Sequence, residues 1–476
     1  MLPEILSNQV CSLRPREDKF TFSAIFAMDE SGTVHDRWFG RTVIHSDRRF
    51  AYEEAQAVLE GDDDPLASEL RLMDRMAKAL RAQRMNDGAI AFDRAEVKFR
   101  LDAHNQPIGA YVKEAKDSNK LIEEFMLLAN REVATFAGGK KPNARTKQAP
   151  RTMVYRIHDQ PDPEKLISLS QFVRPLGYQL QVDSPGNVRR SINDLLRQVK
   201  GTPEANMLET LTVRTMAKAV YSCQNVGHYG LAFDDYTHFT SPIRRYPDMM
   251  VHRLLQDTLD GKPSPKADPL EELCQHSSQR EQNAADAERS SIKYMQAVYM
   301  EQFVGEQFDG IISGVTDWGV FVEVPETACE GLVRLREFRD DYYSVDSERH
   351  CLVGERWGKE FRLGDPLRIV VKDVDVVRKT IDFGVASSRD SGGTSGGRFS
   401  ERPSGRSSTP TRGQFDETRP AEAGSRWGSP RRSGGSSSGN AGFGGRSSNS
   451  GKPSGKGGGK GHRKGPNTTS AKKKRR

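Results

Sequence analysis

The chain lacks the features that mark several classes of protein. It contains no run of about 18 apolar residues, which argues against a transmembrane helix. Its first residues show no charged segment followed by an apolar one, so no signal peptide is predicted. The five cysteines are widely separated and include no Cys-x-x-Cys pair, which predicts neither a zinc site nor a disulfide framework. We therefore expect reduced thiols and a cytoplasmic location.

Apolar residues are also sparse, at 35% of the 476 residues, whereas 29% are charged. These fractions are unusual for one compact enzyme and typical of folded domains that carry a polar tail. The length predicts two or more domains, at roughly 150 residues each. The net charge of +7 favours an anionic partner, and a basic tail that serves only solubility is the alternative.

Hydrophobic periodicity predicts a mixed α/β region over residues 1–267. Alternating apolar residues indicate a hairpin in 19–44 and further strands in 90–115. Apolar residues three or four apart predict three helices before residue 140 and predominantly helical structure in 164–222. The three earlier helices are expected at residues 52–59, 66–85 and 122–136. This order of elements predicts a sheet with helices packed on it.

The remainder of the chain divides into three parts. Residues 268–304 are expected to form one long helix, since no proline or glycine interrupts 270–298. Five short strands within 305–386 predict a small all-β barrel. From residue 387 onward the composition is dominated by Gly, Ser, Arg and Lys, which predicts a disordered basic tail.

The most informative run lies within residues 227–253 and is rich in aromatic, histidine and arginine side chains. Ser241 precedes Pro242, which predicts an N-cap followed by a proline at the first helical position. Such a helix start presents free backbone N–H groups to an anion. The run also contains rings whose faces can stack on bases, namely Tyr229, Tyr236, Phe239 and Tyr246.

Two adjacent arginines, Arg244 and Arg245, follow this predicted helix start. Their guanidinium groups suit bidentate contact with phosphate. Neighbouring residues of a helix point about 100° apart, so we expect only one of the two to face a given ligand. The alternative is that both arginines stabilise the helix start by binding carboxylates such as Asp248.

This run resembles the signature of the RNB domain of the RNase II/RNase R family. Segments 1–8, 11–13, 121–130 and 156–159 are similar to other parts of that domain. The resemblance covers roughly residues 1–385, and the order of segments with the basic tail favours the RNase R type. It implies an α/β RNB-type catalytic domain, incomplete in this chain. It also implies hydrolysis of RNA from the 3′ end to nucleoside 5′-monophosphates, with Mg²⁺ held by aspartates.

The resemblance implies roles for individual residues. Arg244 would hold a phosphate near the scissile bond and stabilise charge in the transition state. Glu123 or Glu124 would contact the 3′-terminal nucleotide, and Tyr52 would lie near the site. A solvated helix face for the glutamates and a half-buried packing position for Tyr52 are the alternatives. Further RNA contacts are expected from the same run, at His238, Ser241, Arg245 and Tyr246.

In the family, the aspartate cluster precedes the segment that resembles residues 1–8, and cold-shock-type domains precede that cluster. We therefore expect no complete Mg²⁺ site in this chain, and weak or absent activity for these 476 residues alone. The triplet 62–64 consists of aspartates in a polar turn, where consecutive side chains diverge, and we interpret it as a solvated loop. Residues 234–235 and 340–341 have the same interpretation. A non-catalytic RNA-binding protein is the alternative function.

Residues 305–386 resemble an S1-type OB-fold, a barrel that binds single-stranded RNA. Trp318 and Phe321 can stack on bases, although a core position is equally plausible for Phe321. Arg334 replaces a histidine usual in the family and keeps positive charge there, and Lys372 is a further expected contact. The tail suits sequence-independent contact with phosphates through its terminal lysines, Lys472, Lys473 and Lys474. We expect a monomer that binds single-stranded or structured RNA, with ribosomes or RNA-decay proteins as candidate partners.

Overall fold

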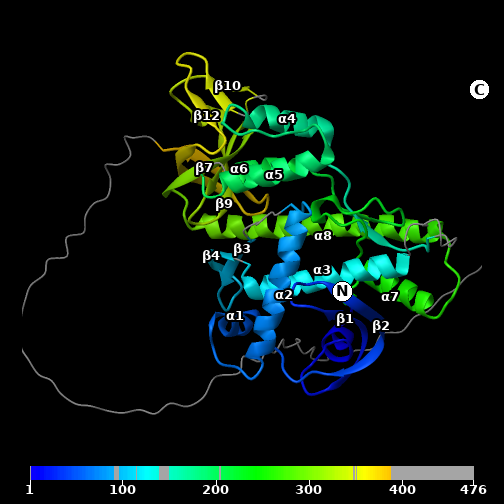
Figure 1. Ribbon diagram of the computed structural model, residues 1–476. Helices are drawn as coiled ribbons and strands as arrows, with labels where there is room; N and C mark the ends of the chain where they lie inside the picture. Colours follow the sequence, from blue (N-terminus) through cyan, green and yellow to red (C-terminus); the bar gives the residue numbers. More distant parts are fainter. Residues whose placement is uncertain are drawn as a thin grey trace, which may run out of the picture. The chain divides into compact units, whose positions relative to one another are not determined.

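The computed structural model describes residues 2–90, 96–113, 115–138, 150–202, 205–346, 349 and 351–386. These residues belong to the first of two units, which ends at Ser395. The expected disordered tail, with Lys472, Lys473 and Lys474, lies outside the described residues. Figure 1 shows the described helices and strands. None of these helices combines the length and the apolar character needed to cross a membrane.

The hairpin expected near the start of the chain is confirmed. After a short π-helical turn, η1 (Leu6–Val10), strand β1 (Asp18–Met28) pairs antiparallel with β2 (Val34–His45). The carboxylate of Asp29 accepts the backbone N–H groups of Ser31 and Thr33, which closes the turn between the strands. The hairpin buries Phe39 of β2 in a core that helices complete.

The predicted helices are confirmed, with small differences at their ends. They are α1 (Tyr52–Glu60), α2 (Ala67–Asn86) and α3 (Asp117–Gly138), and they pack on one another. Between α2 and α3 lies a second hairpin of β3 (Glu96–Leu101) and β4 (Pro107–Lys113). Helix α3 is amphipathic, and its buried face includes Leu121, Leu128 and Val133.

Three further helices form a separate apolar cluster. They are α4 (Pro163–Val173), α5 (Pro185–Val199) and α6 (Ala205–Thr215). Helices α4 and α5 both start with a capped proline. Asp162 accepts the N–H of Glu164 before the first of them, and Ser184 accepts the N–H of Asn187 before the second.

The expectation of one sheet covered by helices is wrong for the described residues. Strands β1 to β6 form three two-stranded sheets, the third from β5 (Tyr155–Ile157) and β6 (Val220–Ser222). All three pairs are antiparallel, and the first two are hairpins closed by short turns, which need no helical crossover. The helices therefore pack mainly on each other.

Helix α8 (Ala267–Glu301) confirms the long helix predicted from residue 268, and it contributes to two cores. Near its start it packs on β6 and on α7 (Tyr246–Leu259), and Cys274 is fully buried there. Near its end it packs on strands of the barrel, and Met300 is fully buried in the barrel core.

The five-stranded barrel is confirmed. Its strands are β7 (Gln307–Thr316), β8 (Gly319–Val324), β9 (Cys329–Arg334), β13 (Pro366–Asp375) and β14 (Thr380–Val385), closed in the order β13-β14-β9-β8-β7. Between β9 and β13 the chain forms a short helix η3 (Leu335–Glu337) and an additional sheet, which the sequence did not predict. That sheet contains β10 (Tyr343–Asp346), β11 (Cys351–Gly354) and β12 (Glu360–Arg362), strands too short for a clear periodic pattern.

Candidate nucleic-acid interface

The predicted helix start at Ser241 is wrong. Residues 241–245 form a turn in which the N–H groups of Arg244 and Arg245 donate to Ser241 O at 3.3 and 3.1 Å, and α7 begins only at Tyr246. A second proline explains the difference. In a helix that started at Pro242, Pro247 would occupy an interior position, where its ring and missing N–H disrupt the helix. Beginning at Tyr246 places Pro247 in the first turn, where it is tolerated.

The carboxylate of Asp248 organises this turn. It is fully buried, and its Oδ2 accepts the N–H of Ser241 at 2.9 Å and Arg245 Nη2 at 2.9 Å. Arg245 Nε also lies 2.8 Å from Asp248 Oδ1. The alternative in which an arginine binds Asp248 therefore holds for Arg245. Arg244 is exposed and forms no ion pair with any carboxylate of the described residues.

The expectation that four rings of the run offer free faces is wrong for three of them. Tyr229, Tyr236 and Phe239 are buried, whereas Tyr246 keeps 49% of its surface exposed. Asn130 of α3 fixes the buried part of the run, because its Nδ2 donates to Tyr236 Oη at 3.2 Å and its Oδ1 accepts Phe239 N–H at 2.9 Å. These rings stabilise the fold beneath the turn and leave Tyr246 beside the two arginines.

Three half-buried histidines lie within the run or against it. His158 donates from Nε2 to Ala217 O and accepts Gly230 N–H at Nδ1, so its tautomer is fixed. The His158 and His228 ring centroids are 5.0 Å apart. His238 is hydrogen-bonded through Nδ1 to Tyr221 Oη at 2.8 Å. The pKa of each of these three histidines is lowered, which favours the neutral imidazole, and a neutral ring has one nitrogen that can accept a hydrogen bond.

Burial is the main cause of this neutrality. It lowers the pKa of His228 to about 3, with a smaller effect from His158 and Arg156. It lowers the pKa of His238 to about 2, helped by the positive charges of Arg245 and Arg156. Desolvation disfavours the charged imidazolium in both cases.

The two glutamates singled out on α3 have different surroundings. Glu124 is 3% exposed and accepts from Arg84 of α2, at 3.2 Å from Nε and also from Nη2. Glu123 is 51% exposed, and its carboxylate lies 3.7 Å from Arg84 Nη2. Glu124 therefore joins α3 to α2 through a buried ion pair, while Glu123 faces solvent. Tyr52 is the first residue of α1 and is 47% exposed.

The barrel presents an aromatic and a basic side chain on adjacent strands. Trp318 lies in the turn between β7 and β8 and is 73% exposed, whereas Phe321 of β8 is half-buried. In the β8–β9 register Gly319 faces Arg334 and Phe321 faces Leu332, so Phe321 and Arg334 share one face. Arg334 forms an ion pair with Asp382 at 2.8 Å, and Lys372 forms one with Glu337.

Most aspartates considered as metal ligands have other partners. Asp64 binds Arg48 and accepts Leu66 N–H. Asp235 accepts from Asn225 Nδ2 at 2.6 Å. Asp341 accepts the N–H groups of Tyr342, Arg356 and Trp357. These contacts identify the three carboxylates as structural acceptors.

Within the described part of the chain, one group of three His, Cys, Asp or Glu side chains is close enough to share an ion, namely Cys223, Glu271 and Cys274. Two thiols and one carboxylate do not fit Mg²⁺, which prefers oxygen ligands. Sequence reasoning missed this group because about 50 residues separate Cys223 from the other two. The only available signal was the helical spacing of Glu271 and Cys274.

The buried ion pair of Glu124 leads to a test of its role. Changing Glu124 to Gln removes the buried carboxylate that accepts hydrogen bonds from Arg84 and leaves only the exposed Glu123 carboxylate, 3.7 Å from Nη2, near that buried charge, which should reduce the free energy of unfolding by about 3 kcal/mol. The matched variant Glu123→Gln, on the same helix but exposed, should change it by about 0.5 kcal/mol or less. Denaturant unfolding of both variants gives the comparison. Equal stability losses would contradict a structural role specific to Glu124.

The histidines lead to a pH dependence. Below pH 6.5 an unfolded histidine gains a proton that folded His238, with a pKa of about 2, does not bind. The free energy of unfolding is therefore unaffected by His238 above pH 6.5 and decreases as the pH falls. Between pH 7.5 and 5.5 the wild type should lose about 1.4 kcal/mol more than His238→Gln. Identical pH profiles of the wild type and His238→Gln would contradict the burial of a neutral His238.

Comparisons with known proteins agree with both halves of this architecture. A family model of the RNB domain matches residues 1–261, and one of the S1 RNA binding domain matches residues 301–386. Ribonuclease R of Aquifex aeolicus is 40% identical over 395 residues, which cover 80% of this chain and 54% of that protein. The chain thus spans about half the length of the curated relatives it matches.

Two solved structures are also similar. The first is Mycoplasma genitalium RNase R in complex with ribose methylated single-stranded RNA, with a TM-score of 0.73 and 28% identity over 81% of this chain and 60% of that chain. The second is the same enzyme in complex with double-stranded RNA, with a TM-score of 0.67 and 26% identity over 81% and 63% of the two chains. Sequence and structure therefore agree that the chain belongs to the RNB family and to its Ribonuclease R branch.

Proposed function

We propose that the protein acts as a 3′-to-5′ exoribonuclease of the Ribonuclease R type, which releases nucleoside 5′-monophosphates during RNA degradation. The observation that carries this proposal is the RNB match over residues 1–261, followed by an S1 match over 301–386. RNA as the substrate class is supported by the similar Mycoplasma genitalium RNase R, which was solved with single-stranded and double-stranded RNA.

In this proposal Arg244 is the residue that holds a phosphate near the scissile bond. The side chain of Arg244 is exposed, whereas the guanidinium group of Arg245 forms an ion pair with Asp248. A free guanidinium can donate two parallel hydrogen bonds to a phosphate and stabilise charge that develops in the transition state. The roles of Arg245 and Ser241 are to keep the turn in place, and the exposed ring of Tyr246 is available to stack on a base.

His238 supports this arrangement as a positioning residue. It is neutral and hydrogen-bonded to Tyr221, so it adds no positive charge that competes with Arg244 for the phosphate. Of the two glutamates, we propose Glu123 for contact with the 3′-terminal nucleotide, because its carboxylate is exposed. Tyr52, exposed at the start of α1, stays a candidate for a contact near the same end of the RNA.

The barrel and the tail would bind the RNA outside the hydrolytic centre. Trp318 is proposed to stack on a base, with Phe321 next to it and Arg334 on the same face for phosphate contact. Lys372 and the terminal lysines would add sequence-independent attraction that weakens with salt. The five free cysteines of the chain are consistent with a reducing cytoplasm. We propose a monomer, with ribosomes or RNA-decay proteins as candidate partners.

Mg²⁺ in this family would supply charge stabilisation and activation of a water. The described residues offer no cluster of oxygen ligands that fits it, since their one candidate group contains two thiols. A second candidate function is that of an RNA-binding protein without hydrolytic activity.

The two functions differ in the fate of a 5′-labelled single-stranded RNA. Incubation with the chain and Mg²⁺ should give progressive shortening from the 3′ end if it is an exoribonuclease, and bound but intact RNA if it is not. A circular RNA of the same sequence is the control, because it offers no 3′ end. Degradation of the circle would contradict an exonuclease.

The arginine pair permits a matched test. Arg244→Ala should lower RNA affinity by about tenfold, the equivalent of one charge-assisted hydrogen bond, and any hydrolysis rate by about a hundredfold. Its melting temperature should not change. Arg245→Ala should instead lower the melting temperature, because Asp248 becomes a buried carboxylate without a cationic partner. A stable Arg244→Ala variant with unchanged RNA affinity and hydrolysis would contradict the role of Arg244.

The chain also offers a control for stacking on the barrel. Trp318→Ala should weaken binding of single-stranded RNA by about 1–3 kcal/mol, the contribution of one stacked base. Trp357 is similarly exposed but lies in the turn between β11 and β12 of the additional sheet. Trp357→Ala should leave the affinity within about twofold. Fluorescence anisotropy of labelled RNA measures both, and the opposite order of effects would place the stacking site on the additional sheet.

A further inference from the structure

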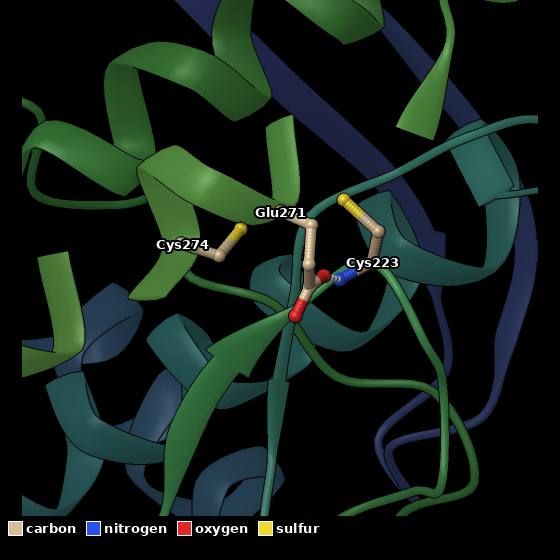
Figure 2. Close-up of side chains that lie close together, drawn as sticks. All are labelled: Cys223, Glu271 and Cys274. Carbon is tan, nitrogen blue, oxygen red and sulfur yellow. Dashed lines mark hydrogen bonds between the residues drawn. The ribbon is translucent and has the colours of Figure 1, made fainter. Parts of the chain in front are cut away.

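Two thiols and one carboxylate meet where the start of α8 lies against the end of β6. Cys223 directly follows β6, and Glu271 and Cys274 are three residues apart on α8, so both lie on one face of that helix. The two sulfur atoms and a carboxylate oxygen all lie within 4.8 Å of one another. Figure 2 shows the two thiols on either side of the Glu271 side chain.

We propose that Cys223, Cys274 and Glu271 bind a thiophilic divalent cation of the Zn²⁺ class, with a water as the fourth ligand. Thiolates select such ions over Mg²⁺. Bonds of about 2.0–2.3 Å in a tetrahedral site place the donor atoms roughly 3.3–3.8 Å apart. The present separations, at most 4.8 Å, reach this geometry through shifts of about 1 Å in the side chains.

The surroundings orient the carboxylate before any ion binds. Glu271 Oε2 accepts the N–H of Cys223 at 2.6 Å, and both carboxylate oxygens lie 3.1 Å from Ser222 Oγ. Hydrogen bonds of this kind from the outer shell fix the orientation of metal ligands. They also leave Oε1 with a lone pair for a cation, because a carboxylate oxygen accepts more than one bond.

Access to the cluster is one-sided. Cys274 is fully buried in the core that α8 shares with α7, whereas Cys223 is half-buried and next to solvent. The thiol of Cys223 otherwise reaches Ala267 O at 4.0 Å, a weak contact that an ion can replace. A cation can therefore enter from the side of Cys223 and bind Cys274 at the edge of the packed core. As the two metal–sulfur bonds form, each thiol releases its proton to solvent.

A bound ion would connect segments that are distant in sequence. Cys223 lies four residues before Gly227, where the family signature begins, and Cys274 belongs to the helix that continues to the barrel. The ion would therefore fix the segment that leads to the signature against α8. This inference does not depend on the proposed exoribonuclease function, because it concerns a separate group of side chains.

Cobalt is the probe for the test. The reduced, metal-free 476-residue chain is titrated with Co²⁺, followed by Zn²⁺. We expect one ion per chain, with a sulfur-to-cobalt charge-transfer band in the near ultraviolet and tetrahedral bands in the visible. Zn²⁺ should abolish both signals and raise the melting temperature. Absence of the charge-transfer band would overturn the proposal.

Variants assign the signal to the three side chains. Cys223→Ser should weaken Co²⁺ binding by about a hundredfold or more, since even outer-shell partners change metal affinity by about 10- to 100-fold. Glu271→Gln should weaken it by at least about tenfold while the charge-transfer band persists. The control is Cys11→Ser, which changes an exposed cysteine outside the cluster and should bind like the wild type.

Cys274 is buried, so Cys274→Ser is informative only if circular dichroism shows a folded protein, and the half-buried Cys223 provides the decisive variant. Undiminished binding by Cys223→Ser would overturn the proposal. So would a mass loss of about two daltons on exposure to air combined with no cobalt signal. That result, with peptide mapping that places the bond between Cys223 and Cys274, would assign the two thiols to a disulfide.

Discussion

The buried carboxylate of Asp248 is the interaction on which the geometry of the signature run depends. It accepts one backbone N–H from the turn and binds the side chain of Arg245. It therefore fixes the path of the chain through the turn and holds the guanidinium group of Arg245 in an ion pair. A buried carboxylate requires this degree of compensation, because desolvation of an isolated charge is very unfavourable. Arg244 remains exposed because its neighbour satisfies that requirement. The single carboxylate of Asp248 thus places two adjacent arginines in different surroundings, with Arg245 in a buried ion pair and Arg244 in solvent.

Much of the architecture could be predicted from the sequence because it depends on local patterns. Alternating apolar residues indicated the first hairpin and the five barrel strands, and an interval without proline or glycine indicated α8. The Ser–Pro pair at Ser241 was misleading, although the same pair at Ser184 does start a helix. The two cases differ in the next proline along the chain. A local signal gave the wrong answer where a second local signal, Pro247, overrode it.

The candidate site was less predictable, because burial depends on contacts between distant segments. Sequence reasoning treated Glu123 and Glu124 alike, and only the packing of α2 on α3 shows that Arg84 forms hydrogen bonds with the buried Glu124 and lies farther from the exposed Glu123. It also treated the four aromatic rings of the run as equally available for stacking. In the structure, hydrogen bonds with Asn130 hold Tyr236 and Phe239 in buried positions. The Cys223, Glu271 and Cys274 cluster is the clearest example. Its members come from β6 and α8, and no spacing rule relates them.

The continuity of α8 has a consequence for how this architecture can vary in evolution. One uninterrupted helix supplies Cys274 to one core and Met300 to another. The number of residues between them therefore sets the angle about the helix axis at which Met300 points relative to Cys274. Inserting a single residue between these positions would rotate the second half by about 100° relative to the first and would turn Met300 away from the barrel interior. Insertions and deletions should therefore accumulate in connecting loops and be excluded from the helix. In homologues, a constant length of this helix would be a more sensitive marker of preserved domain arrangement than the identity of its exposed residues.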